Sequence, residues 1–391
     1  MKNIYTRIDA ALDKLQPEIA GLSEAIHSHP EVSGQEFAAC QYQTDLLTRH
    51  GFTVQAGCLK IPTAFLASYT GKKSGPNLAF LSEYDALPTL GHGCGHNLIA
   101  ALACAAGITL KEFADEFGGN IYVFGCPAEE TNGAKVDMAA RGLFDTMTAA
   151  FLAHPFAVDG SSSSTMAMDA LQFEFYGKAA HAASCPEEGI NALDAVIHTF
   201  NLINALRQRI PETSRIHGII TKGGDAPNII PEYACARFYV RAKRRSALQK
   251  LTAQVIQCAK GAAAGCDTRL EISHFEYSND DFVTNRTLSD LVTEKLRECG
   301  LTAPLQTDIN GGSSDAGNVS YRCPSIQPWF GIGNGLNCGL HTREFKEAAG
   351  TPKALKKALL YAKAFTLSGI ALMQNPTLCD KLRQEFEASI R

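Results

Sequence analysis

Side chains that bind metal ions or exchange protons are concentrated at four places in the 391-residue sequence. The first is a glycine-rich segment in which His92, Cys94 and His96 follow the acids Glu83 and Asp85. A thiolate and an imidazole two residues apart can bind one divalent ion, and the glycine between them permits a tight bend. The alternative is a glycine-rich turn whose histidines are incidental, which the density of such side chains makes the less favoured interpretation.

The second place is the pair Glu129 and Glu130, directly after an apolar run that predicts a buried strand over residues 120–125. Ligands of α/β folds bind beyond the carboxyl ends of the strands, where this pair should lie. One of two neighbouring acids can bind a metal ion while the other exchanges a proton with water. Taken alone, however, the pair is better explained as the acidic start of a helix, which the helix dipole favours.

The third and fourth places are His154, which ends an apolar strand-like segment, and His341, in a Gly-Leu-His-Thr segment. A lone histidine of this kind is more often a core residue than a ligand. Taken together, the four places supply sulfur, nitrogen and oxygen donors that suit Zn²⁺, Mn²⁺ or Co²⁺, and enough of them for two ions. The candidate ligands are Cys94, His96, Glu130, His154 and His341, and Glu129 remains as a base.

The first third of the chain alternates helical and strand patterns. Apolar residues at helical spacing predict helices over residues 5–28, 36–49 and 97–117, and short apolar runs predict strands over 78–81 and 120–125. Alternation of this kind predicts an α/β fold with a mostly parallel sheet and helices on both faces.

The middle of the chain has a different pattern. Its strands are expected over residues 171–176, 216–221, 235–242 and 269–277, and its helices over 190–209 and 247–264. The order β-α-β-β-α-β predicts a ferredoxin-like unit, antiparallel, with helices on one face. Helices over 285–300 and 353–373 and a strand over 325–332 then return to the first pattern. The sequence therefore predicts an α/β domain, residues 1–167 and 280–391, interrupted by an inserted α+β domain, residues 168–279.

The composition limits the classes of function. Thirty-six Lys+Arg against 40 Asp+Glu give a net charge of −4, which argues against a nucleic-acid or anionic-membrane partner. With 45% hydrophobic and 19% charged residues, the chain is typical of a globular protein rather than a disordered one. The most apolar stretch, residues 98–110, is shorter than the ~20 residues of a membrane span. No signal peptide is apparent, and 13 cysteines without a C-x-x-C pair predict reduced thiols and a cytoplasmic location.

Several catalytic motifs are absent from the sequence. There is no H-E-x-x-H, which excludes a thermolysin-like protease, and no G-x-S-x-G, so a serine nucleophile elbow has no support. The glycine-rich segment 331–335 superficially suggests a nucleotide loop, but it matches neither a Rossmann fingerprint nor a P-loop, and we discount it.

The order of short motifs along nearly the whole chain resembles the di-metal aminoacylase and carboxypeptidase G family. The motifs are DALP (85–88), GHGCGHN (91–97), PAEE (127–130), AHP (153–155), GKAAHA (177–182) and APNIIPE (226–232). Two later segments, GGSSDAGNVS (311–320) and residues 327–351, look like the branch that contains aminobenzoyl-glutamate hydrolase subunits and dipeptidases for unusual dipeptides. Many relatives have Asp and a further His where this chain has Asn97 and Ile99, but that His is not a ligand.

The resemblance implies a zinc-peptidase-like catalytic domain with an inserted lid and dimerisation domain, and roles for individual residues. Glu129 matches the general base, and His181 matches a histidine that stabilises the developing oxyanion in a neighbouring subunit's site. Asn228 and Arg241 match positions near the substrate carboxylate, although a turn-capping Asn and an exposed strand Arg explain them equally well. Asp85 is expected to hold a ligand in place rather than to be one.

We therefore expect a metal-dependent amidohydrolase, a homodimer with two ions per subunit. Its substrate would be a small molecule: an N-acyl amino acid, an aminobenzoyl-glutamate-like conjugate or a dipeptide. One rival is a cysteine hydrolase with Cys94 as nucleophile and His92 or His96 as base, which leaves the other candidate ligands unexplained. Another is a non-catalytic metal-dependent binding protein, against which the intact Glu129 argues.

Overall fold

The computed structural model describes residues 2–307, 312–333 and 339–390, so Asn334 and Gly335 of the discounted glycine-rich segment lie outside the described residues. The chain forms two compact units. The large unit comprises Met1–Ser164, Phe282–Gly311 and Asp315–Arg391, and the inserted unit comprises Thr165–Asp281 and Gly312–Ser314. The sequence analysis predicts domain boundaries after residues 167 and 279. It does not predict that the short segment Gly312–Ser314 belongs to the inserted unit.

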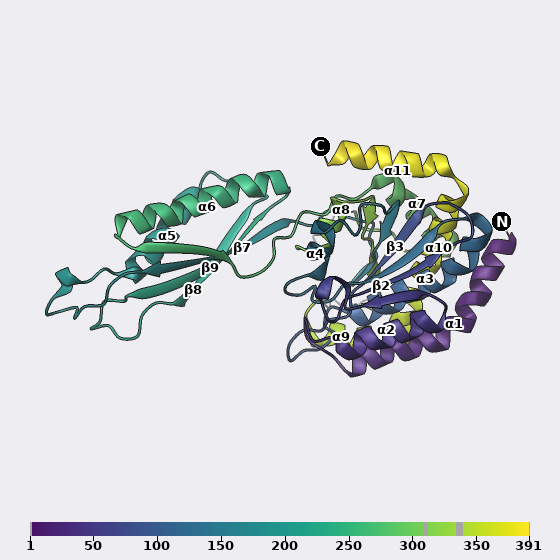
Figure 1. Ribbon diagram of the computed structural model, residues 1–391, viewed down its shortest axis with the longest axis horizontal. Coiled ribbons are helices and arrows are strands. Elements are labelled where there is room, and N and C mark those ends of the chain that lie inside the picture. The colour runs from purple at the N-terminus through teal and green to yellow at the C-terminus, as the bar shows by residue number, and fades with distance from the viewer. Residues whose placement is uncertain (1, 308–311, 334–338, 391) are drawn as a thin grey trace. The chain divides into compact units, whose positions relative to one another are not determined.

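A six-stranded sheet organises the large unit (Figure 1). Its order is β1 (Thr53–Ala56), β2 (Phe65–Thr70), β4 (Asn120–Gly125), β3 (Asn77–Ser82), β5 (Ala149–Phe151) and β11 (Ser325–Ile326). The pairs β4–β3, β3–β5 and β5–β11 are parallel, whereas β2 runs antiparallel to both of its neighbours. The mostly parallel α/β sheet is therefore confirmed, with β1 and β2 as additional strands that the apolar runs do not reveal.

Alternation along the central strands distributes side chains between two cores. Leu78 and Phe80 point to the same core as α1 (Lys2–Ser28), α3 (His96–Phe117) and α10 (Pro352–Gln374). Ala79 and Leu81 belong to a second core with α4 (Ala134–Ala140) and α8 (Ala316–Ser320). Because successive residues of a strand face opposite sides of the sheet, apolar residues at all four positions require helices on both faces. The remaining helices of the unit are α2 (Phe37–Arg49), α7 (Arg286–Glu298), α9 (Arg343–Ala349) and α11 (Pro376–Ser389).

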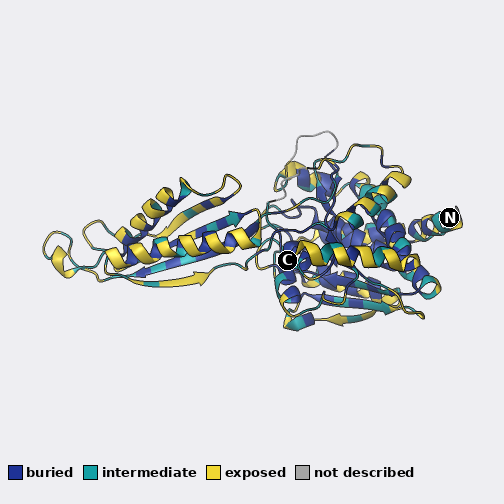
Figure 2. Cartoon of the chain, turned by 90° about the horizontal axis from the view of Figure 1, so that it is seen from above, coloured by how far each residue is buried: buried dark blue, intermediate teal, exposed yellow. Residues whose placement is uncertain are grey.

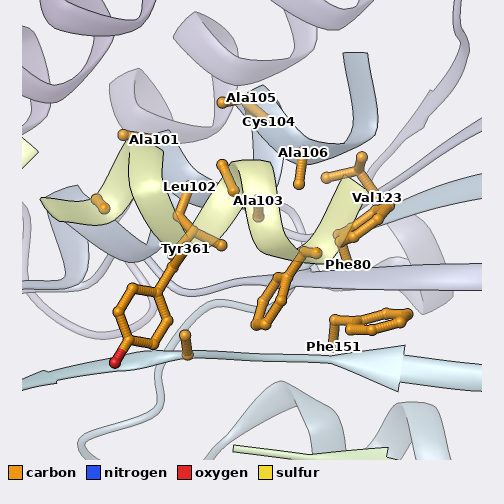
Figure 3. Close-up of a cluster of buried hydrophobic side chains, with 14 of the residues drawn as sticks. Phe80, Ala101, Leu102, Ala103, Cys104, Ala105, Ala106, Val123, Phe151 and Tyr361 are labelled. Carbon is orange, nitrogen blue, oxygen red and sulfur yellow. The ribbon is translucent and has the colours of Figure 1, made fainter. Parts of the chain in front are cut away.

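Helix α3 lies directly on the sheet because its residues are small. Figure 3 shows alanines of this helix in one cluster of buried side chains with Phe80, Val123 and Phe151, with Ala106 next to Val123. A Cβ at Gly107 would lie 2.6 Å from Val123 Cγ2, so glycine permits this close approach. The helix extends beyond the apolar stretch of residues 98–110, and its length and composition would suffice to cross a membrane. However, 89% of its most apolar part is buried inside the protein.

Two predicted strands are each divided in the structure. The strand predicted to end at His154 consists of β5 and, after a break, β6 (His154–Phe156), so His154 begins a strand. The strand predicted over 325–332 consists of β11 and β12 (Trp329–Gly331), which pairs with β6 in a separate two-stranded sheet. Pro328 lies at the second break; proline has no N–H to continue a ladder, which accounts for the division there.

The inserted unit is a four-stranded antiparallel sheet of order β10-β7-β9-β8. Its elements are β7 (Ala167–Tyr176), α5 (Ala192–Arg207), β8 (Arg215–Lys222), β9 (Tyr233–Ala242), α6 (Arg245–Gly265) and β10 (Arg269–His274). Both helices share one core with the sheet, and their outer faces are exposed in Figure 2. This arrangement confirms the ferredoxin-like prediction. Gly312 O accepts a hydrogen bond from Met166 N (2.7 Å), which attaches the short third segment to this unit.

Replacing Phe151 by alanine should destabilise the large unit. Its ring is 1% exposed and stacks on Phe80 with 5.4 Å between the ring centroids. Removing a buried phenyl ring costs about 3–5 kcal/mol, because a cavity remains. Denaturant unfolding of Phe151→Ala should show this loss, whereas Phe37→Ala, at a phenylalanine that is 57% exposed, serves as the matched control and should change stability little. Equal effects of the two substitutions would contradict the assignment of the core.

Candidate metal centre

A glycine turn leads from the carboxyl edge of the sheet into α3. Gly95 caps the helix with φ +75°, and a Cβ there would lie 2.7 Å from Pro155 Cγ. A left-handed backbone and a close neighbour both favour glycine at this position. The turn buries Cys94 (6% exposed) and His96 (0%) beside the start of β6, where His154 lies.

The five candidate ligands lie together in two groups that share the Cys94 thiol. One group consists of Cys94, His96 and His154, and the other of Cys94, Glu130 and His341, with the ligand atoms of each group within 4.8 Å of one another. Cys94 Sγ lies 3.7 Å from His154 Nε2 and 3.5 Å from His341 Nε2. His341 Nε2 lies 3.5 Å from Glu130 Oε1. Residues from distant parts of the sequence thus form one continuous donor cluster.

Hydrogen bonds orient the imidazoles of the cluster. His96 Nδ1 donates to Asp85 Oδ1 (2.9 Å), and His154 Nδ1 donates to the carbonyl oxygen of Pro155 (2.8 Å). Asp85 Oδ2 also accepts the amide of Glu130 (3.0 Å), so one carboxylate aligns two members of the cluster. Partners of this kind determine which ring nitrogen faces a metal ion. The structure thus places Asp85 against His96 Nδ1, on the side of the ring away from Nε2.

The donor set fits divalent metal ions. His96 Nε2 and Glu130 Oε1 are buried and have no hydrogen-bond partner among the described residues, which is costly unless a cation contacts them. Burial lowers the pKa of His154 to about 4, so its imidazole is neutral at pH 7, which is the form that can bind a metal ion. Burial also raises the pKa of the Cys94 thiol, so a cation that binds there must displace a proton. Since a nucleophilic cysteine needs a lowered pKa, the rival thiol mechanism is disfavoured.

Glu129 lies beside the cluster in a strained turn. Its carboxylate forms a group with His96 and Glu130, again within 4.8 Å. Burial, together with the carboxylates of Glu83, Glu130 and Asp315, raises its pKa well above the usual value. The preceding residue, Ala128, has φ +63°, an uncommon conformation for a residue with a Cβ, and such strain is concentrated at functional sites. A carboxylate with a raised pKa beside a metal centre is suited to accept and return a proton.

His92 lies outside both donor groups. Its Nε2 donates to the carbonyl oxygen of Ile26 (3.0 Å), and its ring stacks on His27. Burial lowers its pKa to about 3. His92 is thus a neutral core histidine, which the sequence alone does not distinguish from its neighbours in the glycine-rich turn.

Three charged residues next to Glu129 are not assigned by the sequence analysis. Lys135 on α4 is fully buried, with Nζ 2.9 Å from Glu83 Oε1 and 2.5 Å from Asp315 Oδ1. The position of Glu83 two residues before Asp85 is a local signal for this site. Lys135 and Asp315 are 180 residues apart, so no local pattern reveals that they meet.

The remaining candidate residues lie in the inserted unit, at opposite ends of its sheet. His181 pairs with Ile229 in an isolated bridge, next to Asn228, beyond the end where Tyr176 pairs with Tyr233. Its Nδ1 accepts the amides of two following residues (3.2 Å each), so in the neutral ring the proton is on Nε2. Arg241 lies eight residues after Tyr233 in strand β9, which corresponds to a distance of roughly 26 Å.

Arg241 lies on the open face of the inserted sheet. Its Nε is buried without a hydrogen-bond partner among the described residues, and its Nη1 lies 3.4 Å from Ser313 Oγ. A guanidinium with an unused buried donor can bind a carboxylate. One small molecule cannot contact both Arg241 and the His181 of the same inserted unit, because of the length of the sheet between them.

Comparison with known proteins agrees with this geometry. Residues 167–265 match the model of the peptidase dimerisation domain of the M20 family. The chain is 37% identical to the Xaa-Arg dipeptidase of Mus musculus, covering 98% of this chain and 91% of the relative. It is 30% identical to one of the p-aminobenzoyl-glutamate hydrolase subunits of Escherichia coli, covering 99% and 95%.

Solved structures share the fold. An aminobenzoyl-glutamate utilization protein from Klebsiella pneumoniae has a TM-score of 0.72 at 21% identity, covering 93% of this chain and 98% of that one. A dinuclear metal-binding peptidase of the M20 family from Bacillus subtilis has a TM-score of 0.68 at 19% identity, covering 96% and 99%. Fold, site and relatives define this protein as a metal-dependent hydrolase of amide bonds. The chain belongs to the M20 family of peptidases.

Replacing Cys94 by serine should weaken metal binding at both donor groups, because the thiol belongs to both. Loss of a residue that merely orients a ligand costs 10–100-fold in affinity, so loss of a shared ligand should cost at least about 100-fold. Elemental analysis after dialysis against limiting Mn²⁺ measures the effect. Cys104→Ser, at a buried thiol of α3 outside both groups, is the matched control and should retain the ions. Full metal content in Cys94→Ser would contradict the assignment of Cys94 as a metal ligand.

Proposed function

We propose that this M20 hydrolase uses two divalent ions, Zn²⁺ or Mn²⁺ with Co²⁺ as a third candidate, to cleave a dipeptide or a related amide. The observation that carries the proposal is the pair of donor groups around Cys94, with Glu129 beside them. One ion would be held by Cys94, His96 and His154 and the other by Cys94, Glu130 and His341. Mixed sulfur, nitrogen and oxygen donors suit these metals.

The chain's own residues would divide the work of the reaction. Bound divalent ions supply a lowered pKa for water and a positive field for developing negative charge. Glu129 takes the proton of the attacking water and returns it to the leaving amine, for which its raised pKa is suited. Asp85 keeps the His96 ring in position during both transfers.

The substrate class follows from the relatives and from Arg241. One relative is named for Xaa-Arg dipeptides and another for aminobenzoyl-glutamate. Each of these compounds is a small amide whose amine part is an amino acid. We propose the same class here, with dipeptides first because the dipeptidase shares more identity with this chain. Arg241 would bind the carboxylate of that amino acid. Asn228 lies beside His181 at the other end of the sheet, so it would reach the same substrate only from the partner subunit.

The length of the inserted sheet supports a homodimer with shared sites. If Arg241 and His181 both contact one substrate, they must come from different chains, because roughly 26 Å of strand separates their ends of the sheet. His181 would then donate its Nε2 proton to the oxyanion in the partner's site. The edge strand β8 carries Ile219 (64% exposed) and Ile220 (45%), an apolar edge that pairing could cover.

We also propose that the protein acts in the cytoplasm. The twelve cysteines that the structure describes are all free thiols, which a reducing compartment preserves. Fractionation of cells that express the protein tests this, and recovery from an oxidising compartment would contradict it.

Glu129→Gln should retain its metal ions but lose turnover by at least about 100-fold, because general-base catalysis contributes about 10²–10⁴. The assay measures released amine from dipeptides with C-terminal arginine, aminobenzoyl-glutamate and N-acyl amino acids, with Mn²⁺ or Zn²⁺ added after chelation. The wild-type chain should hydrolyse a dipeptide, and metal content measured in parallel separates lost chemistry from lost metal. Near-normal turnover by metal-loaded Glu129→Gln, or wild-type hydrolysis that survives chelation, would refute the mechanism.

Mixing two inactive variants tests the shared site. Glu129→Gln lacks the base and His181→Ala lacks the oxyanion donor, so each homodimer should be inactive. A heterodimer should regain up to one working site in two, because one site combines an intact Glu129 with the partner's His181. Tagged chains confirm that subunits exchange; an unchanged, inactive mixture of exchanged chains, or a monomeric elution profile, would exclude sharing while leaving the metal chemistry unaffected.

A further inference from the structure

A buried ammonium group lies next to Glu129 and has no part in the proposed reaction. Lys135 is 0% exposed and contacts Glu83 and Asp315 through Nζ. Its backbone N–H also donates to the second carboxylate oxygen of Asp315 (3.1 Å). A Cβ at Gly133 would lie 2.1 Å from that oxygen, so a glycine makes room for the pair. A buried charge held this closely must serve the groups that surround it.

These surroundings are a further group of possible metal ligands. Carboxylate oxygens of Glu83, Glu129 and Asp315 lie within 4.8 Å of one another. Glu83 is 1% exposed, and its Oε2, buried and without a hydrogen-bond partner among the described residues, lies 3.8 Å from His96 Nε2. Three carboxylates this close together, two of them fully buried, repel one another and favour a cation among them. A divalent ion at this point would take Glu129 as a ligand.

We propose that Lys135 is a positioning residue whose ammonium occupies this cation position, keeps a third metal ion out and leaves Glu129 available for proton transfer. The inference rests on the proposed role of Glu129 as base. An ammonium supplies positive charge through an ion pair with Glu83 and a hydrogen bond to Asp315 without coordinating Glu129. Burial alone would lower the pKa of Lys135, but Asp315 and Glu83 outweigh it and raise the pKa, so the side chain remains charged.

Counting bound metal ions tests this inference without relying on activity. Lys135→Met and Lys135→Gln remove the ammonium and leave three carboxylates, so each variant should bind one more Mn²⁺ per chain than the wild type. Lys135→Arg retains the charge and should bind the wild-type number. Adding Asp315→Asn to Lys135→Met removes one carboxylate and should abolish the extra ion. Equilibrium dialysis with elemental analysis gives the counts, and in the neutral variants kcat should fall while KM changes little.

The possible outcomes are distinct. A wild-type count in folded Lys135→Met and Lys135→Gln overturns the inference. A wild-type protein with one ion would contradict the two-ion proposal, but the increment between variants would still decide the role of Lys135. If the neutral variants fold only when Mn²⁺ is present, the ion replaces the ammonium and the inference is supported. If they remain unfolded in excess Mn²⁺ while Lys135→Arg folds, Lys135 serves the fold alone and the inference is wrong.

Discussion

The concentration of buried acids at one edge of the sheet is the constraint on which the rest of the large unit depends. Glu83, Asp85 and Asp315 are each at most 1% exposed, and Glu129 and Glu130 lie beside them. Carboxylates at such distances cannot all be charged without compensating positive charge. Lys135 supplies part of that positive charge. The two donor groups around Cys94 are suited to bind metal ions, which would supply the rest.

The sheet explains how side chains from the whole chain reach this edge. Parallel strands end on the same side, so the segments after β3 and β4 bring the glycine-rich turn and the Glu129–Glu130 pair together. The break between β5 and β6 then moves His154 into a second small sheet, where Trp329 pairs with it. If β5 had continued through His154, this residue would have remained in the six-stranded sheet. The irregular backbone is therefore part of how the site is built.

The sheet of the inserted unit separates its candidate substrate-binding residues. Its register fixes Arg241 at one end of β9 and the His181–Asn228 bridge beyond the other. Helices cover only one face, so Arg241 on the other face can meet a ligand. In the homodimer that we propose, symmetric pairing of two chains would let both ends of the sheet contribute to catalytic sites.

Local sequence patterns determined a large part of this protein. Helical periodicity located α1, α2, α3 and α10, alternation located β7 and β9, and the ligand types of Cys94, His96 and the Glu129–Glu130 pair pointed to a metal centre. These features can be predicted because helical and strand periodicity and the chemistry of a ligand motif depend on residues that are close in sequence.

Only the tertiary structure decided which of these residues meet. In the structure, His92 contacts Ile26 in the core rather than the candidate ligands. The predicted strands near His154 and Pro328 are each interrupted, and Lys135 contacts Asp315, 180 residues further along the chain. The family resemblance supplied His181 and Arg241 as candidates, but the register of β7 and β9 set the distance between them. The physical reason is that burial and charge pairing depend on long-range packing, which a sequence pattern of a few residues does not contain.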